Sequence, residues 1–266
     1  MTEPASAQPP VLSDIDGAVL SLMLNRPDRL NAVNRALYQA LMSTVEAAAA
    51  DDRVRCIILT GSGRAFSAGA DLKAHADTPP TANERKRYAR AAQRANRALQ
   101  QCAKPVVAAV NGAAVGAGLE LALSCDFIVV ADDAKLRLPE LALGTFFGGG
   151  VAHTLPQRVG LARARELLFL GDSVAGERAV EIGLADFAVA ADRVAVAARE
   201  LATRLAERAP IPMRLAKRLL GRAPRLSRRT LMREEAAALA ECMGTRDWAE
   251  GVTAFREKRA PRYTGE

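Results

Sequence analysis

Residues Lys104–Phe127 read KPVVAAVNGAAVGAGLELALSCDF and place a strand, a glycine-rich loop and a helix in direct succession. The run PVVAAV at residues 105–110 is apolar and rich in valine, which is typical of a strand buried on both faces. Asn111 and Gly112 end this strand, and a helix is expected to open at Gly118 and to run to Cys125. This succession is the unit from which α/β proteins are built.

The same succession recurs on both sides of this stretch. VRCIILT at residues 54–60 predicts a second buried strand, and FIVVA at residues 127–131 predicts a third. A hairpin is expected over 11–24 and a short strand over 135–138, and helices are expected over 30–50 with Asn31 as the cap, 84–101, 162–170, 175–182, 194–208, 212–220 and 231–242. Strands joined through helices indicate an α/β core of repeated ββα units.

The chain has 266 residues, half of them hydrophobic, and is long enough to bury a sizeable core. We interpret residues 1–10 as a disordered tail, 11–200 as the core that carries the site, and 201–266 as an appended helical region. The opening MTEPASAQPP has no basic or apolar segment, so we expect no signal peptide. The longest apolar stretch, residues 105–119, is too short and too polar at its edges to span a membrane.

The net charge of +7 is compatible with a polyanionic ligand, a phosphate-bearing cofactor or an acidic surface. Because acids and bases are interleaved, a solvated arginine-rich surface is favoured over a nucleic-acid site. Aromatic residues make up only 4%, which argues against RNA modules that stack bases. The four cysteines have no CxxC spacing and are interpreted as buried, reduced thiols of a cytosolic protein. Two histidines without clustered acids do not predict a metal site.

Two glycine-rich loops, GSGRAFSAGADLK at residues 61–73 and NGAAVGAGLE at residues 111–120, each follow a buried strand. Neither matches the P-loop, and the spacing GxxxGxG differs from the dinucleotide motif GxGxxG. The loops could carry two backbone N–H donors that converge on one developing oxyanion, or they could be tight turns required by close packing. The occurrence of two such loops with acids nearby favours the first interpretation.

Two glutamates lie close to these loops. Glu120 falls in the first turn of the expected helix, where the helix dipole favours its ionised form. Glu140 lies in the apolar stretch LRLPELALG, where it either caps a helix or is partly desolvated with a raised pKa. Two carboxyls in different surroundings can divide acid and base work on one water molecule. A serine nucleophile is disfavoured because GxSxG is absent and only two histidines occur.

Several segments together resemble the enoyl-CoA hydratase/isomerase (crotonase) family. They are NRPDRLNA (25–32), GSGRAFSAGADLK (61–73), KPVVAAVNGAAVGAGLELALSCDF (104–127), LPELALG (138–144) and AFREKRAPRY (254–263). The resemblance implies a ClpP-like spiral of ββα turns in which residues 11–200 hold an acyl-CoA site. It also implies that residues 201–266 form a helical oligomerisation region that builds a homotrimer or a hexamer. The resemblance further implies that the main-chain N–H groups of Ala70 and Ala117 stabilise a thioester enolate.

Hydratases of this family carry two glutamates, and Glu120 and Glu140 have the matching spacing. By resemblance, Glu120 activates the water that attacks the β-carbon and Glu140 protonates the α-carbon. The implied reaction converts 2-enoyl-CoA to 3-hydroxyacyl-CoA and needs no metal or redox cofactor. The alternatives are a Δ3–Δ2 enoyl-CoA isomerase, or another CoA-thioester reaction that uses the same oxyanion hole. A non-catalytic RNA- or protein-binding homologue is a further alternative, for which the basic segment Glu84–Arg97 is the best feature.

The resemblance also implies contacts with coenzyme A. They fall on Arg26, Asp28, Arg29, Leu30, Ala68, Asp71, Leu72 and Lys73, with Phe255 and Lys258 reaching the coenzyme A of the same or a neighbouring subunit. Arg26 could contact phosphate oxygens or form a structural pair. The chain departs from the family pattern at Phe147, Val151 and His153, beside the acyl pocket. Residues 74–82 are expected to form part of the acyl wall.

Overall fold

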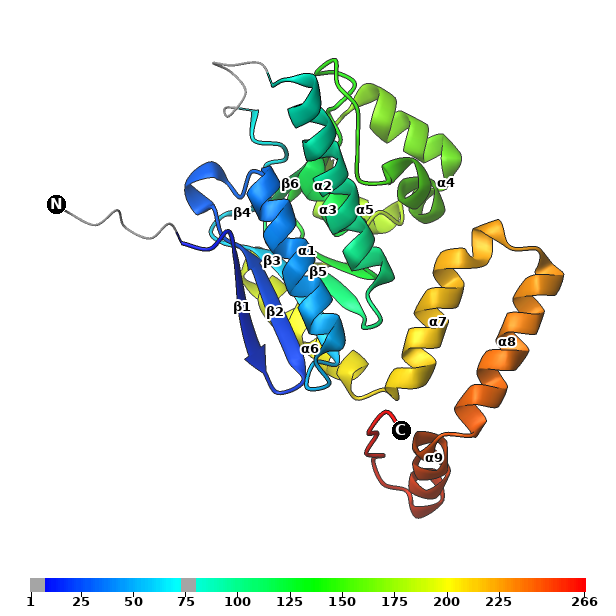
Figure 1. Ribbon diagram of the computed structural model, residues 1–266. Helices are drawn as coiled ribbons and strands as arrows, with labels where there is room; N and C mark the ends of the chain where they lie inside the picture. Colours follow the sequence, from blue (N-terminus) through cyan, green and yellow to red (C-terminus); the bar gives the residue numbers. More distant parts are fainter. Residues whose placement is uncertain (1–7, 73–79) are drawn as a thin grey trace.

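The computed structural model describes residues 8–72 and 80–266, which form two β-sheets surrounded by helices (Figure 1). The first sheet has the strand order β1-β2-β3-β5-β7-β10, and the second has the order β4-β6-β8-β9. The strands of the first sheet are β1 (Val11–Asp16), β2 (Val19–Leu24), β3 (Cys56–Gly61), β5 (Val106–Val110), β7 (Phe127–Ala131) and β10 (Phe187–Val189). Those of the second are β4 (Ala65–Ser67), β6 (Ala113–Val115), β8 (Lys135–Arg137) and β9 (Val174–Ala175).

The first sheet is parallel from β2 to β10, and only the β1–β2 hairpin is antiparallel. All five residues of β5 are buried, which agrees with its valine-rich sequence. Each of β3, β5 and β7 is followed within a few residues by a short strand of the second sheet, and then by a helix. This repeated ββα step confirms the predicted spiral, and it brings the loops after the strands to one region.

The helices are α1 (Arg35–Ala50), α2 (Ala82–Gln101), α3 (Ala117–Ala122), α4 (Val151–Leu170), α5 (Gly176–Glu181), α6 (Val194–Ala206), α7 (Pro210–Arg222), α8 (Arg228–Met243) and α9 (Arg246–Glu257). Helix α6 packs across β2, β3, β5 and β7, while α1 and α2 pack against each other (Figure 1). The sequence patterns missed α9 and the strands β9 and β10, and they treated β4 and β6 as parts of the two glycine-rich loops. They also placed the start of α4 at Ala162, whereas the helix begins at Val151 and bends at Gly160, where φ is 74°.

The predicted start of the first long helix was wrong by five residues. Leu30 and Asn31 have left-handed φ values of 49° and 55°, and α1 begins only at Arg35. Asn34 is the cap, because its side chain accepts a hydrogen bond from the Leu37 amide at 2.9 Å. The Asn31 side chain instead donates 2.8 Å bonds to the carbonyls of Ser62 and Ala65, so it ties the residues before α1 to the first glycine-rich loop.

The C-terminal helices α7, α8 and α9 extend away from the two sheets (Figure 1). Lys217 of α7 anchors this extension: its Nζ lies 2.6 Å from Asp126 Oδ2 and donates to the carbonyls of Leu99 and Lys104. Every residue of α8 is described, and none of them is buried. Large apolar side chains are exposed along the extension, among them Leu220, Met232, Leu239 and Phe255. The role of residues 201–266 in oligomerisation stays a prediction.

Among residues 8–72 and 80–266, no helix combines the length and the apolar character that are needed to cross a membrane. The predicted disordered tail, residues 1–10, lies mostly outside the described residues. The described part of it joins the fold, since the Asn25 amide donates to the Pro10 carbonyl at 2.8 Å.

Candidate active site

The two glycine-rich loops pack directly against each other. Gly69, in the first loop, has a φ of 93°, and a Cβ atom there would lie 2.7 Å from the Val115 carbonyl oxygen. The same position is 3.8 Å from the amide nitrogen of Ala117, the first residue of α3. Only glycine allows this approach, because any side chain at residue 69 would push the two loops apart. The close packing of the two loops is therefore compatible with the other interpretation, in which their amides act together on one oxyanion.

In the described part of the chain, the local hydrogen-bond pattern gives the main-chain amides of Ala70 and Ala117 no acceptor. Ala70 forms an isolated parallel bridge with Val33, in which Val33 N donates to Gly69 O at 2.7 Å and Asp71 N donates to Val33 O at 3.1 Å. The bridge uses the peptide groups on either side, so the Ala70 N–H faces away from Val33. Ala117 opens α3, where the first amides have no acceptor within a helix. Their action as oxyanion donors stays a prediction.

Glu120 projects from α3 into a protected space. Its side chain is buried, with 3% of the residue exposed, and Oε1 accepts a hydrogen bond from the Gly148 amide at 3.0 Å. Burial raises the pKa of Glu120 from 4.5 to about 7, and the nearby Glu140 carboxyl also raises it. The Gly148 and Gly149 amides act in the opposite direction. Glu120 is therefore a group that can gain or lose a proton near neutral pH.

Glu140 lies against the start of α3, on a turn that follows β8. Its Oε1 would be 2.8 Å from a Cβ atom placed on Gly116, the residue before Ala117. Its Oε2 is buried and has no hydrogen-bond partner among the residues that the structure describes. Burial raises the pKa of this carboxyl as well. Of the two alternatives left by the sequence, desolvation is the one found here.

A pair of tyrosines that the sequence analysis missed lies beside the two carboxyls. Tyr38 of α1 and Tyr88 of α2 pack edge to face, with ring centroids 5.6 Å apart. Burial raises the pKa of Tyr88 to about 12 and that of Tyr38 well above its usual value, and the charges of both glutamates contribute to each shift. No local pattern could have found these tyrosines, because Tyr38 merely continues the apolar face of its helix.

Comparison with known proteins establishes the family. The family model for enoyl-CoA hydratase/isomerase matches residues 14–266. The chain belongs to this family. It is similar to 2,3-dehydroadipyl-CoA hydratase of Escherichia coli, with 36% identity over 93% of this chain and 95% of that protein. It is similar also to crotonyl-CoA hydratase of Syntrophomonas wolfei, with 35% identity over 91% of this chain and 93% of that protein. The crystal structure of an enoyl-CoA hydratase from Bacillus anthracis superposes with a TM-score of 0.93 and 34% identity over 97% of this chain and all of that one.

The coenzyme A contacts that the enoyl-CoA hydratase/isomerase family implies fall into two groups in this chain. Residues 26–30 and 68–72 come together, since the Ala68 amide donates to the Leu30 carbonyl at 2.9 Å. Arg26 Nη2 lies 2.7 Å from Asp71 Oδ2, so these two side chains form a structural pair. Asp28, Arg29 and Leu72 are exposed beside them, and Lys73 lies outside the described residues.

The second group, Phe255 and Lys258, is separate from the first. Both residues are exposed at the end of α9, which lies near the start of α7 (Figure 1). Within one chain, the structure does not bring them near the loops of residues 26–30 and 68–72. Whether they contact coenzyme A stays a prediction.

The segment that departs from the family pattern, around Phe147, Val151 and His153, places apolar side chains next to Glu120. Phe146 and Phe147 stack with ring centroids 4.1 Å apart; Phe146 is 70% exposed, while Phe147 packs against the core. Val151 is buried at the start of α4. His153 lies one turn from Gln157, whose Nε2 is 2.9 Å from His153 Nε2. Most of the expected acyl wall, residues 74–82, lies outside the described residues.

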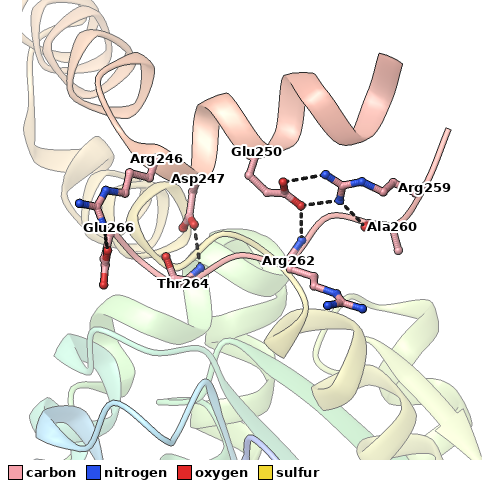
Figure 2. A pocket seen from close by; sticks show the side chains of 8 residues that line it. All are labelled: Arg246, Asp247, Glu250, Arg259, Ala260, Arg262, Thr264 and Glu266. Atoms are coloured by element: carbon pink, nitrogen blue, oxygen red, sulfur yellow. Dashed lines mark hydrogen bonds and ion pairs between the residues drawn. The ribbon is translucent and has the colours of Figure 1, made fainter. Parts of the chain in front are cut away.

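A cavity of about 810 Å³ occurs elsewhere, between α9 and the C-terminal tail (Figure 2). Several of its charged side chains are engaged with each other or with the tail: Glu250 pairs with Arg259 at 2.6 Å, and Asp247 accepts from the Thr264 amide at 2.7 Å. These contacts hold the tail against α9. The two catalytic candidates, Glu120 and Glu140, lie in the core and take no part in it. In the described part of the chain, His, Cys, Asp and Glu form no group suited to a metal ion.

Proposed function

We propose that this protein hydrates 2-enoyl-CoA thioesters to 3-hydroxyacyl-CoA. The observation that carries the proposal is the pair of buried carboxyls, Glu120 and Glu140, each with a raised pKa, beside the loops that present the Ala70 and Ala117 amides. The names of the relatives, several of them enoyl-CoA hydratases, support the same reaction. The spacing of the two acids favours hydration over isomerisation.

The thioester carbonyl is activated by main-chain donors. When the carbonyl oxygen accepts hydrogen bonds from the Ala70 and Ala117 amides, the negative charge that develops on it as an enolate is stabilised. One such donor contributes about 3 kcal/mol to the transition state in comparable sites. Because the donors belong to backbone held by packing, they need no reorganisation as the charge forms.

Each of the two carboxyls carries out one of the two proton transfers that accompany the addition of water. Ionised Glu120 accepts a proton as the water oxygen bonds to the β-carbon, and the electron pair of the double bond moves toward the thioester carbonyl. Protonated Glu140 then delivers a proton to the α-carbon, and the enolate collapses to the product. Glu120 ends protonated and Glu140 ionised, so a proton returns from one to the other before the next cycle. Coenzyme A enters as part of the substrate, and no step requires a metal or a redox cofactor.

The assembly and the location are part of the proposal. The exposed apolar side chains of α7–α9, together with the absence of buried residues in the fully described helix α8, support a homotrimer or a hexamer built through residues 201–266. All four cysteines are free, and three of them are buried, which supports a reducing, cytoplasmic location. Nucleic acid and membrane are not expected partners.

The proposed reaction is tested with a series of 2-enoyl-CoA substrates from crotonyl-CoA to decenoyl-CoA. We expect the absorbance of the conjugated thioester to fall on addition of the purified protein, with a maximum rate at one chain length. Conversion of 3-enoyl-CoA with little hydration would favour an isomerase instead. A salt-dependent shift of RNA, lost on changing the exposed Arg85, Arg87 and Arg90, without turnover of any thioester would favour the binding homologue.

The pH dependence of hydration follows from the two raised pKa values. As pH falls through about 7, Glu120 takes up a proton and can no longer accept one from water, so kcat/KM should fall. As pH rises, Glu140 loses the proton it must donate, at a pKa that is raised by burial. The profile of kcat/KM against pH should therefore be bell-shaped. An acidic limb at the ordinary carboxyl pKa would contradict the assignment.

A further inference from the structure

A polar cluster that the proposed reaction does not use supports the main chain of Glu120. Ser124 follows the last turn of α3, and its Oγ lies 2.9 Å from the Glu120 carbonyl oxygen. That carbonyl is one of the four at the end of the helix that have no partner inside it. Ser124 shares its one hydroxyl hydrogen between this carbonyl and Asn96 Oδ1, which lies 2.7 Å from Oγ, and Oγ accepts from Gln100 Nε2 at 3.1 Å. Both partners belong to α2, so the hydroxyl joins α2 to the main chain of Glu120.

Asn96 and the carboxyl of Glu120 both lie against Gly149, with no hydrogen bond between them. Asn96 is 1% exposed, and its Nδ2 donates to the Ala92 carbonyl at 2.9 Å with one of its two hydrogens. A Cβ atom placed on Gly149 would lie 2.7 Å from Asn96 Nδ2 and 2.5 Å from Glu120 Oε2. The amide and the carboxylate oxygen therefore flank the same glycine. Since Oε1 takes the Gly148 amide, α2, α3 and the segment 148–149 meet around this one carboxyl.

The surroundings of Glu120 make such support necessary. The groups that face it are Glu140 on the turn after β8, Tyr38 on α1 and Tyr88 on α2, and none of these is a cation. With no positive partner among residues 8–72 and 80–266, the orientation of this buried carboxylate depends on neutral donors and on the geometry of the backbone that carries it. Asn96 of α2 and Ser124, which follows α3, are the side chains that connect α2 to the backbone that carries Glu120.

We propose that Asn96 and Ser124 are positioning residues for Glu120, an inference that rests on the proposed hydratase function. Ser124 holds the short helix α3 at the carbonyl of Glu120, and Asn96 holds Ser124 while its amide packs against Gly149, which the Glu120 carboxylate also borders. Neither side chain contacts the substrate in this arrangement. Their effect is to keep the carboxylate aligned with the attacking water, where small displacements lower the rate strongly.

Single substitutions test the inference on turnover and on the pH profile. Ser124→Ala should lower kcat about tenfold or more with little change in KM, because misalignment affects the chemical step. Ser124→Thr keeps the hydroxyl and should restore most of the rate. Asn96→Leu should lower kcat and move the acidic limb to higher pH, because the carboxylate loses a polar neighbour. Gln93→Leu, at an exposed position of the same helix, is the matched control and should change neither.

The double variant Asn96→Leu/Ser124→Ala completes a double-mutant cycle with the two single variants. Because the two residues act through one contact, its loss in kcat should be close to that of the larger single effect rather than their product. It removes both partners of the Asn96–Ser124 contact together, so neither of these two side chains is left facing a missing partner. A product of the two effects, or rates and pH profiles like those of the original protein, would overturn the inference.

A titration without substrate separates this inference from the reaction. The pKa of Glu120 in the ligand-free protein can be followed by the NMR signal of its side-chain carboxyl carbon. Asn96→Leu should raise this pKa and Gln93→Leu should not. If the unaltered protein hydrated no enoyl thioester, the proposed function would fail, while this titration would still show whether Asn96 supports the carboxylate. An unchanged Glu120 pKa in Asn96→Leu would count against the inference alone.

Discussion

Replacing Glu140 by glutamine is expected to lower kcat for hydration by about 10²- to 10⁴-fold, the contribution of a positioned acid or base. Glutamine has nearly the same shape, so the packing beside Gly116 should survive, but its amide cannot deliver a proton to the α-carbon. The buried Oε2 atom has no hydrogen-bond partner among the described residues, so no neighbour is placed to supply the proton instead. The rate is measured from the absorbance of crotonyl-CoA.

The same substitution should leave the protein at least as stable. The pKa of Glu140 is higher in the folded protein than in the unfolded chain, so the carboxyl favours folding less as pH rises through its folded pKa. A neutral amide removes that loss, and the melting temperature at pH 8 should not fall. Glu177→Gln, at an exposed position, is the control and should leave the rate unchanged. Full activity in Glu140→Gln, with an intact fold, would remove Glu140 from the mechanism.

Replacing Ala117 by proline is expected to lower kcat by about 10²- to 10³-fold, the typical effect of losing one oxyanion donor. Ala117 is the first residue of α3, a position where proline is well tolerated because its N–H has no acceptor in the helix. The substitution therefore removes the proposed donor, and it sets a ring carbon where the amide hydrogen pointed. The helix that carries Glu120 should be retained.

Ala117→Gly is the matched variant, because it keeps the amide and removes only a methyl group. We expect it to retain most of the activity, with a modest loss from added backbone freedom. Circular dichroism and the melting temperature report whether Ala117→Pro keeps its fold. If folded Ala117→Pro hydrated crotonyl-CoA as fast as Ala117→Gly does, the amide of residue 117 could not be the donor.

Local patterns predicted the elements whose burial is continuous along the chain. The strands at 54–60, 105–110 and 127–131 were identified because each is an apolar run bounded by glycine or polar residues. The same approach failed at Leu30, because an apolar residue in a left-handed turn looks like the first residue of an amphipathic helix. It also missed α9, whose helix is largely exposed and has only two buried residues.

The motifs were sufficient to predict the family, the ββα spiral and the two acids, since glycine spacing and acid spacing are local properties of the chain. The partners of those acids required the folded structure. Glu140 is brought to Gly116 and Glu120 to Gly149 by contacts between segments more than twenty residues apart. The pairing of Arg26 with Asp71 and the contact of Asn96 with Ser124 arise in the same way. Which polar groups meet depends on how the two sheets and α1–α3 stack on each other. That stacking is determined by the burial of apolar side chains throughout the core, and no short run of residues determines it alone.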